Sequence, residues 1–345
     1  MTRAATLLLA LLVACTTTTE APVEPPPAEP RSGPVLYYLR RTTLASMDLA
    51  SGRRTTLAEL PSADAALAPD ATRMVVVEET SPLGSSPEGF RKPALLIGPT
   101  EEWAITELGP GRSPLWAPDG SAVAAIARVR GGEGCPGVET EGGGCPATEE
   151  VVAYDPAAPA EPPETLAGPA LGYSLLGWSG ETVLALRAPG EAVLGDEELP
   201  YRPAELWGAS PVGEIFLQVD DDGARFIRVD AQAPSAEVDL DGARLGDGTW
   251  SFDGSTVAVV LLEPVGARLS SRLALIDSES GAVSEVPGGS GAQGQVVWSG
   301  DSKRFAYVRV DPDKKSRLQA VMCTVELDCR PLFSWGQGVT LLGLR

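Results

Sequence analysis

The chain of 345 residues contains no histidine. This absence excludes serine or cysteine nucleophiles paired with an imidazole base, histidine-ligated metals and histidine as a general acid or base. Lysine is scarce, and none of its four copies has a context typical of a buried Schiff-base lysine: Lys92, Lys303, Lys314 and Lys315. A phosphate-binding glycine loop between a strand and a helix is also absent. The sequence therefore predicts a protein that is not an enzyme, with no catalytic residue assigned.

Long apolar runs are missing too, and the stretch at residues 7–13 is too short to span a bilayer. It follows Arg3 and leads into Leu12-Val13-Ala14-Cys15, which resembles the lipobox of bacterial lipoproteins. That resemblance implies that Cys15 is acylated and becomes the mature N-terminus. Thr16 in place of Asp implies sorting to the outer membrane, facing the periplasm or the cell surface. The alternative is an ordinary signal peptide with a chance cysteine.

The expected organisation has three parts. Residues 1–14 are a signal peptide, and residues 15–34 are a Thr- and Pro-rich tether whose composition cannot bury a core. Residues 35–345 form one folded domain. The formal net charge of −20 argues against binding nucleic acid or anionic lipid through bulk electrostatics.

With Cys15 assigned to the lipid anchor, four of the five cysteines are available for disulfides. Their spacing favours local disulfides in an exported protein, Cys135–Cys145 and Cys323–Cys329, the simplest of three possible connectivities. A zinc site would need four ligands, but neither pair has CxxC spacing and no histidine is available. No metal is therefore assigned.

A short phrase recurs six times, as in WAPDGSAVAAIA from Trp116 and WSFDGSTVAVV from Trp250. Each copy has a bulky apolar anchor, then a tight polar turn, then a run rich in β-branched and small apolar residues, which is typical of a buried strand. A hairpin signal follows several copies. The copies begin at Leu67, Trp116, Trp178, Trp207, Trp250 and Trp298.

Such repetition predicts an all-β fold: a single β-propeller of four-stranded blades. The count is seven blades, or six if Trp207 belongs to the preceding blade. The lone strand at residues 339–344 is expected to join the first blade and close the ring. The phrase resembles the W-S-P-D-G repeat of TolB-like, WD-repeat-related propellers of bacterial envelopes.

The repeated acids and tryptophans have structural interpretations. The turn acids are expected to accept local backbone hydrogen bonds, rather than form a ring of ligands: Asp70, Asp119, Asp253 and Asp301. The tryptophans are expected in the core between blades: Trp116, Trp178, Trp207, Trp250 and Trp298. Trp103 lies outside the phrase and is the one to test for surface stacking.

No cofactor is expected. Calcium has two candidate segments, Asp220 to Gly223 and the acids Asp239, Asp241 and Asp247, but neither matches an EF-hand loop.

These observations predict a lipid-anchored envelope propeller, expected to be a monomer, that acts as a non-catalytic scaffold for an envelope protein or a cell-wall polymer. Its contact surface is expected where the long insertions lie, at residues 81–92, 130–149 and 189–203. The alternative is an enzyme or small-ligand binder that uses the central channel, for example a carboxylate-based glycan hydrolase.

Overall fold

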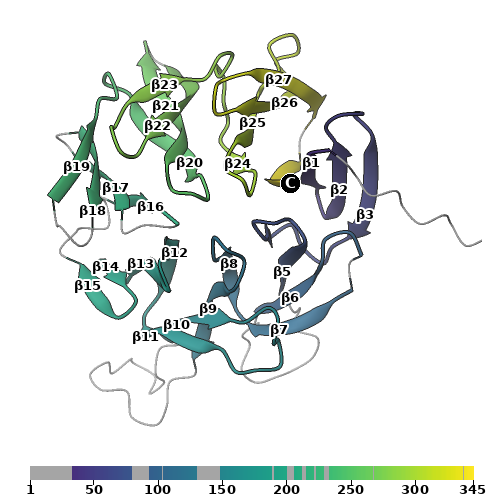
Figure 1. Ribbon diagram of the computed structural model, residues 1–345, viewed down its shortest axis with the longest axis vertical. Coiled ribbons are helices and arrows are strands. Elements are labelled where there is room, and N and C mark those ends of the chain that lie inside the picture. The colour runs from purple at the N-terminus through teal and green to yellow at the C-terminus, as the bar shows by residue number, and fades with distance from the viewer. Residues whose placement is uncertain are drawn as a thin grey trace, which may run out of the picture. The chain divides into compact units, whose positions relative to one another are not determined.

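The computed structural model describes residues 33–79, 93–102, 104–129, 148–188, 190–199, 206–211, 215–220, 223–228, 233–266, 268–336 and 338–345. All belong to one compact unit, Gly33–Arg345. This unit is a ring of seven four-stranded antiparallel sheets, a seven-bladed β-propeller as predicted (Figure 1). Among the described residues, no helix has the length and hydropathy needed to cross a bilayer.

The strands of each blade run from the ring centre outward. Blade 1 comprises β28 (Val339–Leu344), β1 (Val35–Arg40), β2 (Thr43–Asp48) and β3 (Arg54–Glu59). Blade 2 comprises β4 (Ala65–Leu67), β5 (Arg73–Glu79), β6 (Pro93–Pro99) and β7 (Thr106–Pro110). Blade 3 comprises β8 (Arg112–Trp116), β9 (Val123–Val129), β10 (Thr148–Tyr154) and β11 (Glu164–Ala170). Blade 4 comprises β12 (Tyr173–Ser179), β13 (Thr182–Arg187), β14 (Glu191–Leu194) and β15 (Glu197–Leu199). Blade 5 comprises β16 (Leu206–Ala209), β17 (Ile215–Asp220), β18 (Gly223–Arg228) and β19 (Ala233–Val238). Blade 6 comprises β20 (Arg244–Trp250), β21 (Thr256–Val265), β22 (Arg268–Asp277) and β23 (Val283–Glu285). Blade 7 comprises β24 (Val297–Trp298), β25 (Arg304–Val310), β26 (Leu318–Thr324) and β27 (Cys329–Trp335).

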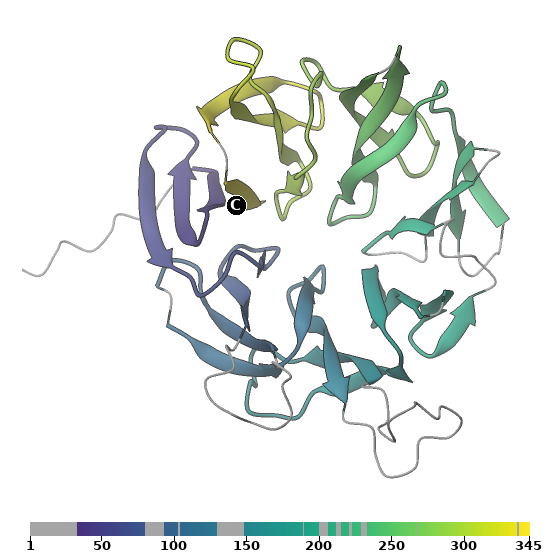
Figure 2. The same ribbon diagram turned by 180° about the vertical axis from the view of Figure 1, so that it is seen from behind.

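The ring closes through the C-terminal strand, as predicted. Strand β28 pairs antiparallel with β1, and the backbones of Val35 and Arg345 exchange two hydrogen bonds of 2.9 Å. Figure 2 shows the C-terminus beside the first blade from the opposite side. Closure leaves no large sheet edge open at the junction of the two ends.

The polar turn of the repeat is built by local hydrogen bonds. In blade 3 the Ala117 N–H donates to the Ala122 carbonyl, and Gly120 takes a φ of 73°, which suits glycine. Each turn acid accepts a backbone N–H two residues further on, at 2.9 to 3.1 Å: Asp70 from Thr72, Asp119 from Ser121, Asp253 from Ser255 and Asp301 from Lys303. The acids therefore hold the corners of the repeat.

The tryptophans at the ends of inner strands are buried between adjacent blades. Three of them also donate their indole N–H to a backbone carbonyl on the inner strand of the preceding blade. These contacts are Trp116 to Ala66 at 2.9 Å, Trp178 to Leu115 at 3.0 Å and Trp298 to Thr249 at 3.2 Å. The repeated anchor thus joins blades by both packing and hydrogen bonding.

Blade 5 departs from the repeat. In blade 6 the anchor Trp250 pairs with Val257, and the N–H of the next residue bonds across the turn. In blade 5 Ala209 makes the same pairing, two residues after Trp207, which falls within the register irregularity between Leu206 and Gly208 at the place that Leu176 takes in blade 4. The anchor position is therefore occupied by alanine. The side chain of Trp207 lies outside the described residues.

Antiparallel order gives the ring two distinct faces. The turns that follow the inner strands lie on one face, which we call the repeat-turn face. The start of β1 at Val35 and the end of β28 at Leu344 lie on the same face. The other face carries the connections from the second to the third strand of each blade, and we call it the insertion face. It carries the long connections after β5 and β9. The third predicted insertion, residues 189–203, is different: it contains β14 and β15, the short outer strands of blade 4.

Candidate functional site

A cleft of about 360 Å³ opens on the insertion face between blades 2 and 3. It is lined by the ends of β5, β6, β8, β9 and β10 and by the connections into β4 and β8. Its lining is rich in charge, and the polar or charged members are Asp64, Arg112, Ser113, Arg128 and Glu149. Cavities of about 300–1,000 Å³ commonly hold ligands or anchor side chains of partners.

Arg112 and Glu149 form the best-defined pair in the cleft. The Nη2 atom of Arg112 lies 2.9 and 2.8 Å from the two carboxylate oxygens, and Nε lies 3.3 Å from Oε1. Glu149 is only 13% exposed and also accepts the Tyr173 N–H at 3.0 Å. Since the carboxylate is fixed from two sides, it holds the more exposed guanidinium in one orientation at the cleft wall.

The backbone beside Arg112 is unusual. Ser113 has a φ of 53°, in the left-handed region that non-glycine residues rarely occupy, and a register irregularity follows in the pairing of β8 with β9. A Cβ at the neighbouring Gly111 would lie 3.1 Å from both Ala125 of blade 3 and Leu95 of blade 2, so the chain passes tightly between the two blades. Local strain of this kind is often found where side chains must be aimed at a ligand.

The surroundings of the cleft favour recognition. The chain leaves β5 at Glu79 and returns at Pro93, and it leaves β9 at Val129 and returns at Thr148, so both longest connections join strands at this cleft. Leu171, two residues before the Tyr173 that bonds Glu149, is 57% exposed on the same face. Farther round the ring, in blade 6, the β21–β22 hairpin with the exposed Val265 and Leu269 turns on the same face.

A second cavity of about 390 Å³ lies at the repeat-turn mouth of the ring. The repeat turns of blades 2, 3 and 7 line it together with the end of β28. Its charged members are Asp70, Asp119, Asp301, Arg304 and Arg345. Three of the four predicted turn acids thus converge here, while Asp253 does not line the cavity.

The channel between the inner strands has a different character. A space of about 150 Å³ there is lined, apart from Thr249, by apolar residues and glycine, including Leu67, Trp250, Val296, Leu342 and Gly343. No charged side chain is among its described lining residues. The charged chemistry of the axis is therefore concentrated at the mouth.

Metal ligation receives no support from side-chain geometry within the described ranges, where no three His, Cys, Asp or Glu side chains group around a common point. In one calcium candidate, Asp239 accepts the N–H of Asp241 at 2.9 Å, which is a local turn contact. In the other, Asp221 and Asp222 lie outside the described residues.

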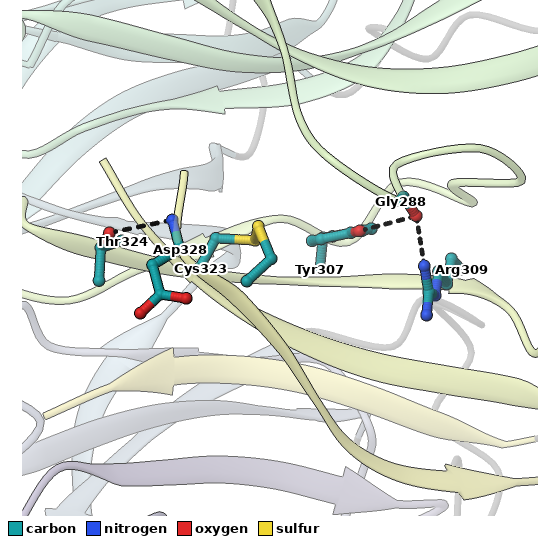
Figure 3. The surroundings of a disulfide bond; sticks show 7 residues. Gly288, Tyr307, Arg309, Cys323, Thr324 and Asp328 are labelled. Atoms are coloured by element: carbon teal, nitrogen blue, oxygen red, sulfur yellow. Dashed lines mark hydrogen bonds between the residues drawn. A yellow bond between two sulfur atoms is a disulfide. The ribbon is translucent and has the colours of Figure 1, made fainter. Parts of the chain in front are cut away.

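The predicted Cys323–Cys329 disulfide is present and joins β26 to β27 at their hairpin end (Figure 3). Nearby on β25, Tyr307 and Arg309 both donate to the Gly288 carbonyl. Cys15, Cys135, Cys145 and Trp103 lie outside the described residues.

Sequence reasoning did not identify Arg112, Glu149, Arg304 or Arg345. No motif marks them, because the Arg112–Glu149 contact joins two strands separated by a third within blade 3. The left-handed Ser113 follows Arg112 in the segment Gly109-Pro110-Gly111-Arg112, whose glycine and proline content was the available signal.

Comparison with known proteins shows the fold and no family. No protein-family model matches the chain, and no curated protein matches it. Among solved structures, one of two prolyl endopeptidases is 12% identical with a TM-score of 0.56 over 91% of this chain and 49% of that chain. The Pyrococcus horikoshii acylaminoacyl peptidase is 14% identical with a TM-score of 0.53, and the match covers 85% of this chain and 48% of the peptidase. TolB from Acinetobacter baumannii is 14% identical with a TM-score of 0.48, and the match covers 90% of this chain and 67% of TolB. The chain thus spans about half the length of the two peptidases.

Proposed function

We propose that this chain is a lipid-anchored cell-envelope scaffold that binds another envelope protein or a wall polymer through its insertion face, without catalysing a reaction. The observation that carries the proposal is the charged cleft between blades 2 and 3, where Glu149 fixes the Arg112 guanidinium beside the two longest connections. Arginine is among the residue types that most often dominate binding interfaces.

The position of the chain's entry supports the same proposal. Gly33, the first described residue, precedes a strand that begins on the repeat-turn face, where Val35 bonds Arg345. The described part of the chain therefore begins on the face opposite the cleft.

The recognition part of the proposal is tested by crosslinking intact cells and recovering the protein with its partners. Arg112→Gln is expected to lower recovery of the specific partner at least tenfold, since removing a charged group that a partner buries in the complex costs about 2 kcal/mol or more. Arg330→Gln is the control, because Arg330 is also held by a hydrogen bond, which it donates to the Leu49 carbonyl, but lies on outer strand β27. Equal recovery with both variants, at unchanged thermal stability, would refute the insertion-face site.

The anchor is tested separately by fractionation. Cys15→Ser is expected to release the protein from membranes, because several acyl chains at about 0.8 kcal/mol per buried methylene provide the attachment. Continued membrane retention of this variant would contradict acylation at Cys15.

A second candidate function is small-ligand binding or carboxylate-based hydrolysis at the central channel. The observation that favours it is the cavity at the repeat-turn mouth, where three aspartates and two arginines meet. The apolar lining of the channel beneath gives no further support to a hydrolytic site.

A further inference from the structure

The cavity at the repeat-turn mouth exists because blade 1 has no repeat turn. The strands β28 and β1 carry the two ends of the ring, so the turns of blades 7 and 2 approach one another across this position. Gly300 of blade 7 packs so closely on the Pro69 carbonyl of blade 2 that a Cβ would overlap that oxygen. The resulting hollow of about 390 Å³ is within the size range of small-molecule sites.

One part of this hollow is anionic. Asp119 accepts both Ser121 bonds through Oδ1, and its Oδ2 has no hydrogen-bond partner among the described residues. The hydroxyl and then the N–H of Ser121 lower the pKa of Asp119, so the carboxylate is charged at neutral pH. For Asp301, burial would raise the pKa, but the bonds from Ser299 and the Lys303 N–H outweigh it and lower the pKa. Asp70 adds a third carboxylate.

The other part is cationic. Arg304 lies 3.4 Å from the Asp301 carboxylate, and Arg345 lies 3.5 Å from Glu101. These are long contacts for a guanidinium, which offers five N–H donors in a planar fork suited to a carboxylate. Most of the donors of both side chains are therefore left for another acceptor.

We propose that the repeat-turn mouth binds a zwitterion of amino-acid or dipeptide size, with its carboxylate on Arg304 and Arg345 and its ammonium group at Asp70 and Asp119. A purely anionic ligand is disfavoured by the three carboxylates and by the net charge of −20. A sugar is disfavoured because no aromatic side chain is among the described lining residues. This site lies on the face opposite the cleft, so it stands or falls independently of the insertion-face proposal.

The test is calorimetric titration of the mature protein with Ala-Ala, N-acetyl-Ala-Ala and Ala-Ala amide. Ala-Ala is expected to bind, and loss of either terminal charge is expected to weaken binding at least tenfold. Absence of binding by Ala-Ala at millimolar concentration, or equal affinity for the blocked peptides, would overturn the proposal.

Matched variants locate the site. Asp119→Asn keeps the turn acceptor and removes the charge, and it is expected to weaken Ala-Ala binding at least tenfold. Asp253→Asn is its control, because Asp253 makes the same turn bonds in blade 6 but does not line the cavity. Arg345→Gln is expected to match Asp119→Asn, while the exposed Arg317→Gln is expected to have no effect. Equal effects of Asp119→Asn and Asp253→Asn would also overturn the proposal, and thermal unfolding of each variant reports its folding.

Discussion

The indole N–H of Trp298 donates a hydrogen bond to the Thr249 carbonyl across the boundary between blades 7 and 6, at 3.2 Å. Trp250 occupies the same position one blade earlier, yet its buried indole nitrogen has no hydrogen-bond partner among the described residues and lies near Gly208 of blade 5. Gly208 directly precedes Ala209 at the anchor position of blade 5, just as Thr249 directly precedes Trp250 at the anchor position of blade 6.

This pair gives a matched prediction. Trp298→Phe keeps most of the apolar volume and removes a bonded N–H, so it is expected to lower the free energy of unfolding by about 1 kcal/mol more than Trp250→Phe. Trp250→Phe removes an unpaired buried donor, which offsets part of its packing loss. Urea unfolding of both variants measures the difference, and equal losses would contradict a stabilising role for the Trp298 bond.

Gly300 yields a second prediction. Gly300→Ala is expected to destabilise the ring by about 1–3 kcal/mol, because the added methyl overlaps the Pro69 carbonyl and must push two repeat turns apart. Gly336→Ala is the control, since its Cβ would meet nothing within 4 Å. The melting temperatures of the two variants test this contact, and a Gly300→Ala protein as stable as the control would show that the turns of blades 7 and 2 are not tightly packed.

The turn acids predict an acid-side loss of stability. Burial would raise the pKa of Asp253, but hydrogen bonds from Ser251 and Ser255 together hold it below its ordinary value. The Ser280 hydroxyl is the largest cause of the lowered pKa of Asp277. A lowered folded-state pKa stabilises the protein above the unfolded value of about 3.9, and this stability is lost as pH falls through the folded pKa.

Thermal melts between about pH 5 and pH 2 measure this effect. The melting temperature of the wild type is expected to fall over this range, and Asp253→Ala is expected to reduce the fall and to cost about 1 kcal/mol at neutral pH. A variant whose pH profile parallels that of the wild type would show that the Asp253 bonds do not contribute.

The hairpin disulfide should contribute measurably to blade 7. Replacing both Cys323 and Cys329 with alanine is expected to cost about 2 kcal/mol, because the bond, at a sequence separation of 6, closes a short loop in the unfolded chain. Denaturant unfolding of the double variant reports the change without disturbing Cys135 and Cys145. An unchanged unfolding midpoint would mean that the bond does not constrain the unfolded chain.

Local chemistry explains which features the sequence predicts. The turn around Asp119 and the anchor Trp116 are adjacent in the chain, so their repetition is sufficient to predict the blades and the ring. Blade 5 is harder, because its anchor position is held by Ala209, while Trp207 lies two residues earlier within the register irregularity of the inner strand. The cleft is harder still, because the pairing of Arg112 with Glu149 depends on which strand ends the ring brings together.

The most direct test of the proposed scaffold role compares two exposed apolar positions on opposite faces. Leu171, 57% exposed, lies on the insertion face, and Ile105, 52% exposed, lies in the β6–β7 connection on the repeat-turn face. A photo-crosslinking amino acid is placed at each position in intact cells, and the adducts are identified by mass spectrometry. The account predicts one dominant envelope partner captured from position 171 and not from position 105. The same capture from both positions, or from position 105 alone, would contradict it.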